Sequence, residues 1–255
     1  MPPRNARSTG NKRYYDWSGE RFWSVTTILG GGVPKPALLP WGIKMVAEGA
    51  VEAVKNGSLV PMVGQDPDAA IQFLKGLPYA KRDRAANLGT EIHQAIEILA
   101  QGQPWPDWPL PIRPHMDRFR EFVETHHPEW VASEATVYSR SQAYAGTLDA
   151  IVVIGGRRLI LDVKTGKGIY PEVALQLAAY RHAEFIGLPD GNESPMPVVD
   201  GAVALHLTDT QWRLIEVDTS DVVFRAFLYA REVFRWQEET SKRVIGDDVA
   251  REVAA

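Results

Sequence analysis

The sequence of 255 residues predicts an α+β (α/β) protein with a mixed central β-sheet flanked by helices and a helical N-terminal lobe. Helical patterns dominate before about residue 130, and strand-like patterns begin there. Two apolar segments, 143–154 and 157–164, are joined by Gly155-Gly156, which favours a tight antiparallel turn. Because a helix, two more strands and a long helix follow, we expect a sheet with helices packed on its faces.

The N-terminal part is expected to begin with a flexible tail over residues 1–13, which are polar and basic. A hairpin around Ser18-Gly19 is expected next, and Gly30-Gly31-Gly32 is expected to be a connector, because no Gly-Lys-Ser/Thr phosphate loop follows it. The predicted lobe covers residues 14–129. Its expected helices span residues 36–55, 67–76, 79–101 and about 114–126.

The predicted core covers residues 130–240. Its expected strands span residues 131–139, 143–154, 157–164, about 198–207 and 211–217. Pro171 is expected to open a helix that Gly187 and Pro189 end, and a long helix is expected over residues 219–240. The charged residues 241–255 are expected to form a second flexible tail.

Composition excludes several classes of function. The net charge is −4 and the pI about 5.9, so no global basic signature for nucleic acid exists, although a local positive channel remains compatible with these values. The absence of cysteine excludes disulfides, thiol catalysis and iron–sulfur clusters, and it fits a reducing cytoplasm. The first residues lack the apolar run of a signal peptide and no apolar stretch of about 18 residues occurs, so no membrane association is expected.

The Gly-Gly hairpin carries the main chemical signal. If Ile154 pairs with Arg157, then Asp149 lies directly opposite Asp162, and Lys164 shares a face with Asp162. Like charges opposite each other destabilise a sheet, and a divalent cation between the carboxylates would remove that cost. Mg²⁺ and Mn²⁺ prefer oxygen ligands and activate water, so the pattern indicates a metal-dependent phosphodiesterase. The alternative is an ordinary surface Asp–Lys pair.

Six other residues are candidate functional residues, each with an alternative. Gln176 and Tyr180 are four residues apart and share a helical face, where they either support the site or belong to the surface and the core. His93 lies in a helix and either completes a metal shell or packs. Glu134 lies on the first core strand and either contacts the metal or faces solvent. Trp105 and Trp108 either stack on unpaired bases or close the lobe.

Four of these segments resemble the ordered motifs of the RecB-type branch of the PD-(D/E)XK nuclease superfamily. They are Gly89-Thr-Glu-Ile-His93, Gly146-Thr-Leu-Asp149, Leu161-Asp162-Val-Lys164 and Gln176-Leu-Ala-Ala-Tyr180. The segment Ser24–Leu29 is also similar to phage-encoded exonucleases of this branch. The resemblance implies a restriction-endonuclease-like core, with Mg²⁺ or Mn²⁺ held by His93, Asp149, Asp162 and the carbonyl of Val163. It implies that Lys164 is the catalytic lysine, that Gln176 and Tyr180 support it, and that Glu134 matches an acidic strand position.

The predicted function is therefore a DNA exonuclease acting in recombination, repair or phage DNA processing. A structure-specific endonuclease of the same superfamily and an inactive DNA- or partner-binding module stay open as alternatives. No Walker motif occurs, so no ATP is expected, and helicase activity would have to come from another chain. A recombinase, a single-strand-binding protein or a helicase is a candidate partner, and the expected location is the cytoplasm, that of the bacterial host if the chain is phage-encoded. The sequence leaves the oligomeric state open.

Overall fold

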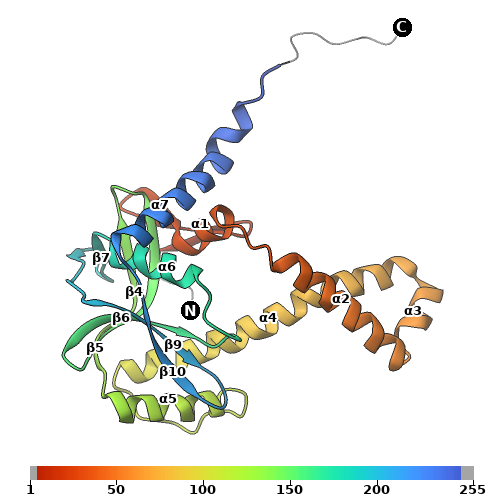
Figure 1. The fold of residues 1–255 in the computed structure, drawn as a ribbon, viewed down its shortest axis with the longest axis horizontal. Coiled ribbons are helices and arrows are strands. Elements are labelled where there is room, and N and C mark those ends of the chain that lie inside the picture. Colours follow the sequence, from red (N-terminus) through yellow and green to blue (C-terminus); the bar gives the residue numbers. More distant parts are fainter. Residues whose placement is uncertain (1–4, 248–255) are drawn as a thin grey trace.

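The computed structural model describes residues 5–247 and confirms an α+β protein with a mixed β-sheet (Figure 1). The strands of the described part are β1 (Ala6–Thr9), β2 (Lys12–Trp17), β3 (Glu20–Ser24), β4 (Glu129–Ser139), β5 (Tyr144–Ile154), β6 (Arg157–Lys164), β7 (Phe185–Gly187), β8 (Glu193–Pro195), β9 (Gly201–Leu207) and β10 (Trp212–Val217). The α-helices are α1 (Val25–Gly32), α2 (Leu38–Lys55), α3 (Leu59–Gln65), α4 (Pro67–Ala100), α5 (Arg113–His126), α6 (Glu172–Arg181) and α7 (Asp221–Arg235). A π-helical turn (Trp236–Thr240) and a 3₁₀ turn (Ser241–Arg243) follow α7.

The sheet forks at strand β5. One edge of β5 pairs antiparallel with β4 along its length. The other edge pairs parallel with β3 at Tyr144 and Ala145, and antiparallel with β6 from Ala150 to Ile154. Residues 146–149 of β5 therefore lie between the two partners on that edge. Strand β6 continues beyond the fork beside the parallel strand β9, as far as the pair Lys164–His206.

Helices cover the two faces of the sheet with separate apolar cores. Helices α1, α6 and α7 pack on one face, where Ile160, Leu177 and Phe227 are buried. The second half of α4 and helix α5 pack on the other face (Figure 1). Ile92, Phe119 and Leu161 are buried there, and burial of their apolar surface stabilises the fold. Alternation along β6 explains this division, because neighbouring side chains point to opposite faces.

The first described residues are strands rather than the expected flexible tail over residues 1–13. Strands β1 and β2 pair antiparallel, and the hairpin predicted around Ser18-Gly19 is confirmed by the pairing of β2 with β3. Their apolar side chains join an aromatic cluster that includes Tyr15, Phe22 and Tyr138, which explains why this polar-looking segment folds. Residues 1–4 lie outside the described range.

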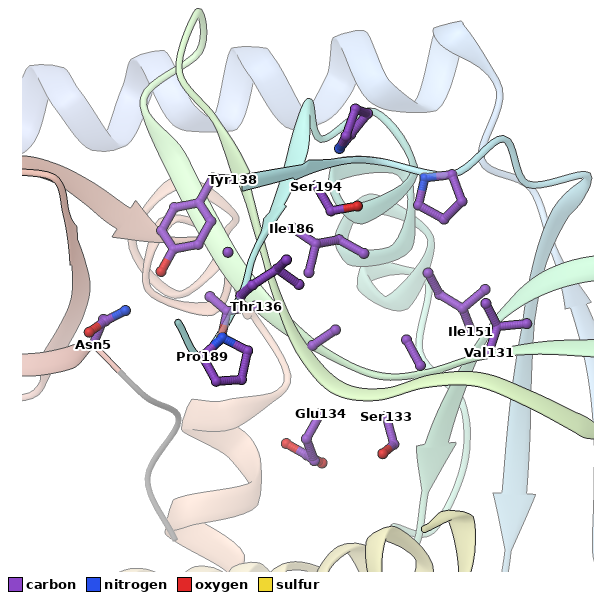
Figure 2. Close-up of a pocket in the computed structure, with 16 residues that line it drawn as sticks. Asn5, Val131, Ser133, Glu134, Thr136, Tyr138, Ile151, Ile186, Pro189 and Ser194 are labelled. Atoms are coloured by element: carbon purple, nitrogen blue, oxygen red, sulfur yellow. The ribbon is translucent and has the colours of Figure 1, made fainter. Parts of the chain in front are cut away.

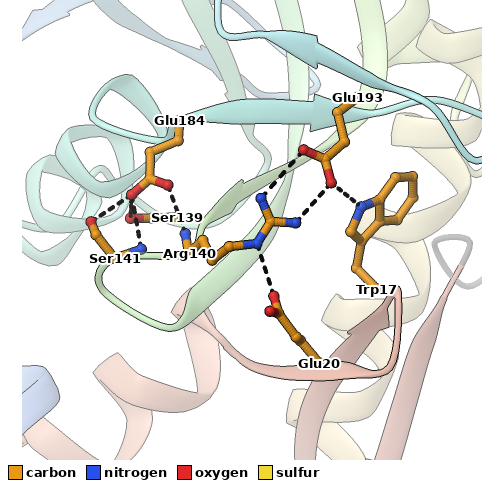
Figure 3. Close-up of polar contacts among 7 residues, drawn as sticks. All are labelled: Trp17, Glu20, Ser139, Arg140, Ser141, Glu184 and Glu193. Carbon is orange, nitrogen blue, oxygen red and sulfur yellow. Dashed lines mark hydrogen bonds and ion pairs between the residues drawn. The ribbon is translucent and has the colours of Figure 1, made fainter.

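Arg140 ties this hairpin to the rest of the sheet (Figure 3). Its guanidinium group donates to Glu20, which lies on β3, and to Glu193 of β8, at 2.9 and 2.7 Å. Glu193 also accepts a hydrogen bond from the indole of Trp17 at 2.8 Å. The network thus joins three segments that are far apart in the sequence.

The triple glycine is helical, which corrects its expected role as a connector. Gly30, Gly31 and Gly32 form the last turn of α1, which crosses α7 closely. A Cβ atom on Gly32 would overlap the carbonyl group of Ala230. Glycine is used here for close approach between helices rather than for flexibility.

Two further boundaries differ from the prediction. The helices expected at residues 67–76 and 79–101 form one helix, α4, in which Pro78 removes a single backbone donor without ending the helix. Helix α6 ends at Arg181, before the predicted stops at Gly187 and Pro189, because Phe185–Gly187 forms β7 and pairs with β4.

The N-terminal lobe is smaller than the predicted range 14–129. Strands β2 and β3 pair within the central sheet, and α5 and the second half of α4 cover one of its faces. The separate part is an arm, residues 38–79, made of α2, α3 and the first third of α4 (Figure 1). Of the predicted C-terminal tail 241–255, residues 248–255 lie outside the described range. None of the described helices has the length and apolar character needed to cross a membrane.

Candidate metal centre

Three side chains from different elements converge at the fork of the sheet. His93 comes from α4, Glu134 from β4 and Asp149 from β5, and each offers a ligand atom within 4.8 Å of the other two. His93 Nδ1 lies 3.3 Å from Asp149 Oδ1. The cavity between them, which Val163 also lines, measures about 10 Å³, close to the roughly 10–15 Å³ that one water molecule needs.

A local distortion of β4 and β5 aims the two carboxylates. Ser133 pairs with Ala150 and Ala135 with Leu148, but no pairing joins Glu134 to Asp149. Glu134 has φ of +47°, in the left-handed region that a glutamate rarely adopts. Such irregularities in a ladder redirect side chains and are common next to functional sites.

Glu134 also faces a second, larger space. It lines a pocket of about 500 Å³ that runs over β4 past Tyr138, and Figure 2 shows Ser133 and Glu134 together at the end nearest α4. Glu134 therefore borders both the small cavity and the larger pocket.

The oxygens of Asp149 are held from two sides. Oδ2 accepts a hydrogen bond from the backbone N–H of Val163 at 2.7 Å, just beyond the end of the β5–β6 ladder. Oδ1 faces His93. Helix α4 comes this close because Gly89, one turn before His93, has no side chain: a Cβ atom there would lie 3.1 Å from Thr165 Oγ1.

Asp162 forms an ion pair with Lys164 on the α6 side of β6. Lys164 Nζ lies 2.8 Å from Oδ1 and 2.7 Å from Oδ2. Only the contact to Oδ1 has hydrogen-bond geometry, so the buried Oδ2 atom lacks a hydrogen-bond partner. Asp162 is 2% exposed, and the Lys164 ammonium group supplies the opposite charge that a buried carboxylate needs.

Helix α6 supports this pair. Gln176 Nε2 donates to Asp162 Oδ1 at 3.4 Å and to the hydroxyl of Tyr180 at 3.2 Å. The Tyr180 ring is 2% exposed and lies over Gly146, where a Cβ atom would come within 2.5 Å of it. This burial leaves no face of the Tyr180 ring open for stacking, and its hydroxyl group accepts a hydrogen bond from Gln176.

Burial and neighbouring charges separate the pKa values of the cluster. Burial alone would lower the pKa of His93, but the charge of Asp149 and the hydrogen bond to it raise that pKa to about 9. The same pairing with His93 holds the pKa of Asp149 below its ordinary value despite burial. Burial raises the pKa of Asp162 to about 6, with Lys164 opposing and Asp149 adding to the rise. Burial and the nearby negative charge of Asp149 raise the pKa of Glu134 to about 7. Pairs of groups pushed apart in this way are typical of functional sites.

The residues present fit a divalent cation. One imidazole and two carboxylates form a mixed N and O donor set that suits Mn²⁺ and, with water, Mg²⁺. Asp162 Oδ2 accepts no hydrogen bond, although it lies 2.7 Å from Lys164 Nζ. Burial raises the pKa values of Asp162 and Glu134, and a bound cation would favour the ionised forms of both carboxylates.

The predicted register of the β5–β6 hairpin is confirmed, but the prediction that Asp149 and Asp162 face each other across it is corrected. Ile154 pairs with Arg157, and the ladder runs to Ala150–Leu161 as predicted. It stops before Asp149 and Asp162, whose carboxylates contact different partners: His93 and Val163 N–H for the first, Lys164 and Gln176 for the second. The three clustered ligand atoms do not include Asp162, so metal ligation by Asp162 and by the Val163 carbonyl stays a prediction.

Other candidates have structural roles. Trp108 is buried against α5 and Trp105 packs 6.0 Å from the Phe119 ring, which favours closure of the lobe over base stacking. The sequence analysis missed His206, whose Nε2 lies 2.8 Å from the Gly166 carbonyl oxygen and fixes the loop after Lys164. A lone histidine within the apolar segment Gly201–Leu207 was the signal that could have identified it.

Comparison with models of known protein families gave no match, and comparison with curated protein sequences gave no significant match. The resemblance to RecB-type nucleases therefore rests on the four motifs alone.

Proposed function

We propose that this chain is a metal-dependent deoxyribonuclease with a restriction-endonuclease-like core of the RecB type. The single observation that carries the proposal is the meeting of His93, Glu134 and Asp149 at the fork of the sheet, next to the Asp162–Lys164 ion pair. The four motifs named from the sequence supply all but one of these residues. Glu134, from a neighbouring strand, completes the set.

In this proposal His93, Glu134, Asp149 and Asp162 hold Mg²⁺ or Mn²⁺. When bound, such an ion acts as a Lewis acid and makes water a better nucleophile at neutral pH. Lys164 presents its donor group beside Asp162, where it stabilises charge that develops on a phosphate oxygen. Gln176 holds Asp162 in place, and Tyr180 holds Gln176.

We propose exonuclease action as the mode of cleavage. The support is the motif resemblance, together with the lack of a separate specificity domain in the described residues: they form one sheet, its covering helices and the small arm. A recombinase, a single-strand-binding protein or a helicase would then act with this chain on DNA ends.

A cleavage assay tests the proposal. End-labelled linear, circular and single-stranded DNA are incubated with Mg²⁺, Mn²⁺ or EDTA. We expect the wild type to degrade linear DNA with Mg²⁺ or Mn²⁺ and to leave circular DNA intact. Asp162→Asn should degrade no linear DNA with either metal. Asp221→Asn on the exposed surface of α7 is the matched control and should cleave like the wild type. Equal cleavage by Asp162→Asn would overturn the site assignment, and nicking of circles would replace exonuclease by endonuclease action.

A further inference from the structure

An exposed apolar groove lies on the arm, away from the metal centre. Leu38 and Trp41 of α2 face Tyr79 of α4 across a space of about 730 Å³. Lys75 and Arg82 also line the groove, and no acidic side chain of the described residues does. The Arg82 guanidinium lies 5.2 Å from the centre of the Tyr79 ring, and Tyr79 is 59% exposed.

Helix α4 connects this groove to the metal centre along one face. Positions 79, 82, 86 and 93 recur at intervals of three, four and seven residues, so Tyr79 and Arg82 lie on the same side of α4 as His93. At 1.5 Å per residue, the distance along the axis is about 16 Å from Arg82 and about 21 Å from Tyr79. Residues 80–87 between them are exposed throughout.

The chemistry of the groove fits an unpaired nucleic-acid strand. Bases have apolar π-faces that stack on tyrosine and tryptophan, and phosphates pair with lysine and arginine. In a duplex the bases stack on one another and cannot reach Tyr79. Arg82 also pairs with Asp83 at 2.7 Å, but both side chains are well exposed, and such surface pairs are weak enough to be exchanged for a phosphate.

We propose that this groove binds the single-stranded end of the nucleic-acid substrate and directs it along α4 to the metal centre. The inference rests on the proposed nuclease function and names its substrate class, a strand with unpaired bases. The all-cationic set of charged groups that line the groove favours a polyanion over an apolar protein segment or a second copy of the chain.

Binding without cleavage tests the inference. Fluorescence anisotropy in EDTA measures the affinity for a labelled 20-nucleotide oligo(dT) and for a duplex of the same length. Loss of one base stack in Tyr79→Ala should weaken single-strand binding roughly 5- to 150-fold. Arg82→Ala should weaken it and reduce the slope of log affinity against log salt by about 0.7.

Two variants serve as matched controls. Arg84→Ala removes the same charge from the opposite face of α4, two residues on, where the helical angle differs by about 200°. Tyr229→Ala removes a tyrosine that is 72% exposed on α7. Both should bind oligo(dT) within about twofold of the wild type.

The outcomes separate this inference from the proposed function. If Tyr79→Ala binds oligo(dT) like the wild type, or loses duplex binding to the same extent, the groove is not a single-strand site. The proposed nuclease function would still stand in either case. A changed oligomeric state in Tyr79→Ala with unchanged DNA affinity would identify the groove as a contact between copies and overturn it as well. If the wild type binds through Tyr79 but cleaves no DNA with any metal, only the proposed function fails.

Discussion

At the scale of single residues, Gly146 shows how the site depends on a missing side chain. A Cβ atom at this position would lie 2.5 Å from Cε1 of Tyr180, whose hydroxyl group holds Gln176. We therefore expect Gly146→Ala to destabilise the protein by about 1–3 kcal/mol, the usual cost of overpacking. Urea denaturation measures the free energy of unfolding.

A matched variant and a double mutant make this prediction specific. Gly168→Ala adds a methyl group where no atom lies within 4 Å, so it should change stability by less than about 0.5 kcal/mol. Combining Gly146→Ala with Tyr180→Leu removes the overlap, so the double mutant should lose less stability than the sum of the single mutants. Strict additivity would show that the Tyr180 ring does not set the cost.

Glu134 makes the stability of the metal-free protein depend on pH. Burial raises its folded pKa from 4.5 to about 7, so the folded state binds its proton more tightly than the unfolded state. The stabilisation is complete below pH 4.5 and is lost as the pH rises to about 7. Glu134→Gln cannot ionise, so its stability relative to the wild type should rise over this interval and stay level above it.

Thermal melts in EDTA from pH 4.5 to 8.5 measure this difference. The difference between variant and wild type reports the Glu134 carboxyl together with its interactions with Asp149 and His93, whose charges raise and lower its pKa respectively. A flat difference for Glu134→Gln would mean that its carboxylate is not buried in the ionised state.

The sequence could predict which side chains come together around Asp162, because their spacings are local. Asp162 and Lys164 are two residues apart on a strand, Gln176 and Tyr180 are four apart on a helix, and the contacts among them follow from these periods. The orientation of Asp149 could not be predicted, because it depends on the broken β4–β5 ladder. Glu134 depends on the same distortion and on a backbone φ of +47°, which no local pattern signals.

At the scale of elements, the helices and strands predicted from the sequence were wrong where tertiary contacts override local preference. Strand β1 is short and polar and is stabilised by its partner β2 and the aromatic cluster behind it. The last turn of α1 contains three glycines, which are poor helix formers, yet they let α1 approach α7. Helix α4 continues through Pro78 because its two ends are anchored on different partners, the arm helices and the sheet. These are long-range causes.

The Arg140 network yields a prediction about the β2–β3 hairpin. Arg140→Ala removes the hydrogen bonds to Glu20 and Glu193, which join the hairpin to β8 (Figure 3). Because the ion pairs are exposed, global stability should change little. Local opening should become more frequent, so hydrogen exchange should be faster in β2 and β3 than in the wild type.

Mass spectrometry of exchanged peptides measures this effect. Arg157→Ala, which removes an exposed pair with Glu216 at another place in the sheet, is the matched control and should leave exchange in β2 and β3 unchanged. Unchanged exchange in Arg140→Ala would mean that the aromatic cluster alone holds the hairpin in place.

At the scale of the whole molecule, the candidate metal centre joins the two layers of helices through the fork of the sheet. His93 comes from α4 on one face, and the Asp162–Lys164 pair is held by α6 on the other. No single element contains enough ligands to bind an ion alone. Ion binding should therefore require the folded protein and stabilise it as a unit.

This linkage gives a prediction for metal addition. A ligand that binds only the folded state at 100 times its dissociation constant stabilises it by about 2.7 kcal/mol. For a chain of this size, that corresponds to a rise in Tm of roughly 5–10 °C. We expect Mn²⁺ or Mg²⁺ to raise Tm relative to EDTA in the wild type and in Asp221→Asn. Asp149→Asn should show no rise in Tm, because asparagine carries no charge to bind the ion. Its side-chain oxygen can still accept the hydrogen bond from Val163 N–H, so the local structure is kept. Scanning fluorimetry measures Tm, and an equal rise in Asp149→Asn would place the ion elsewhere.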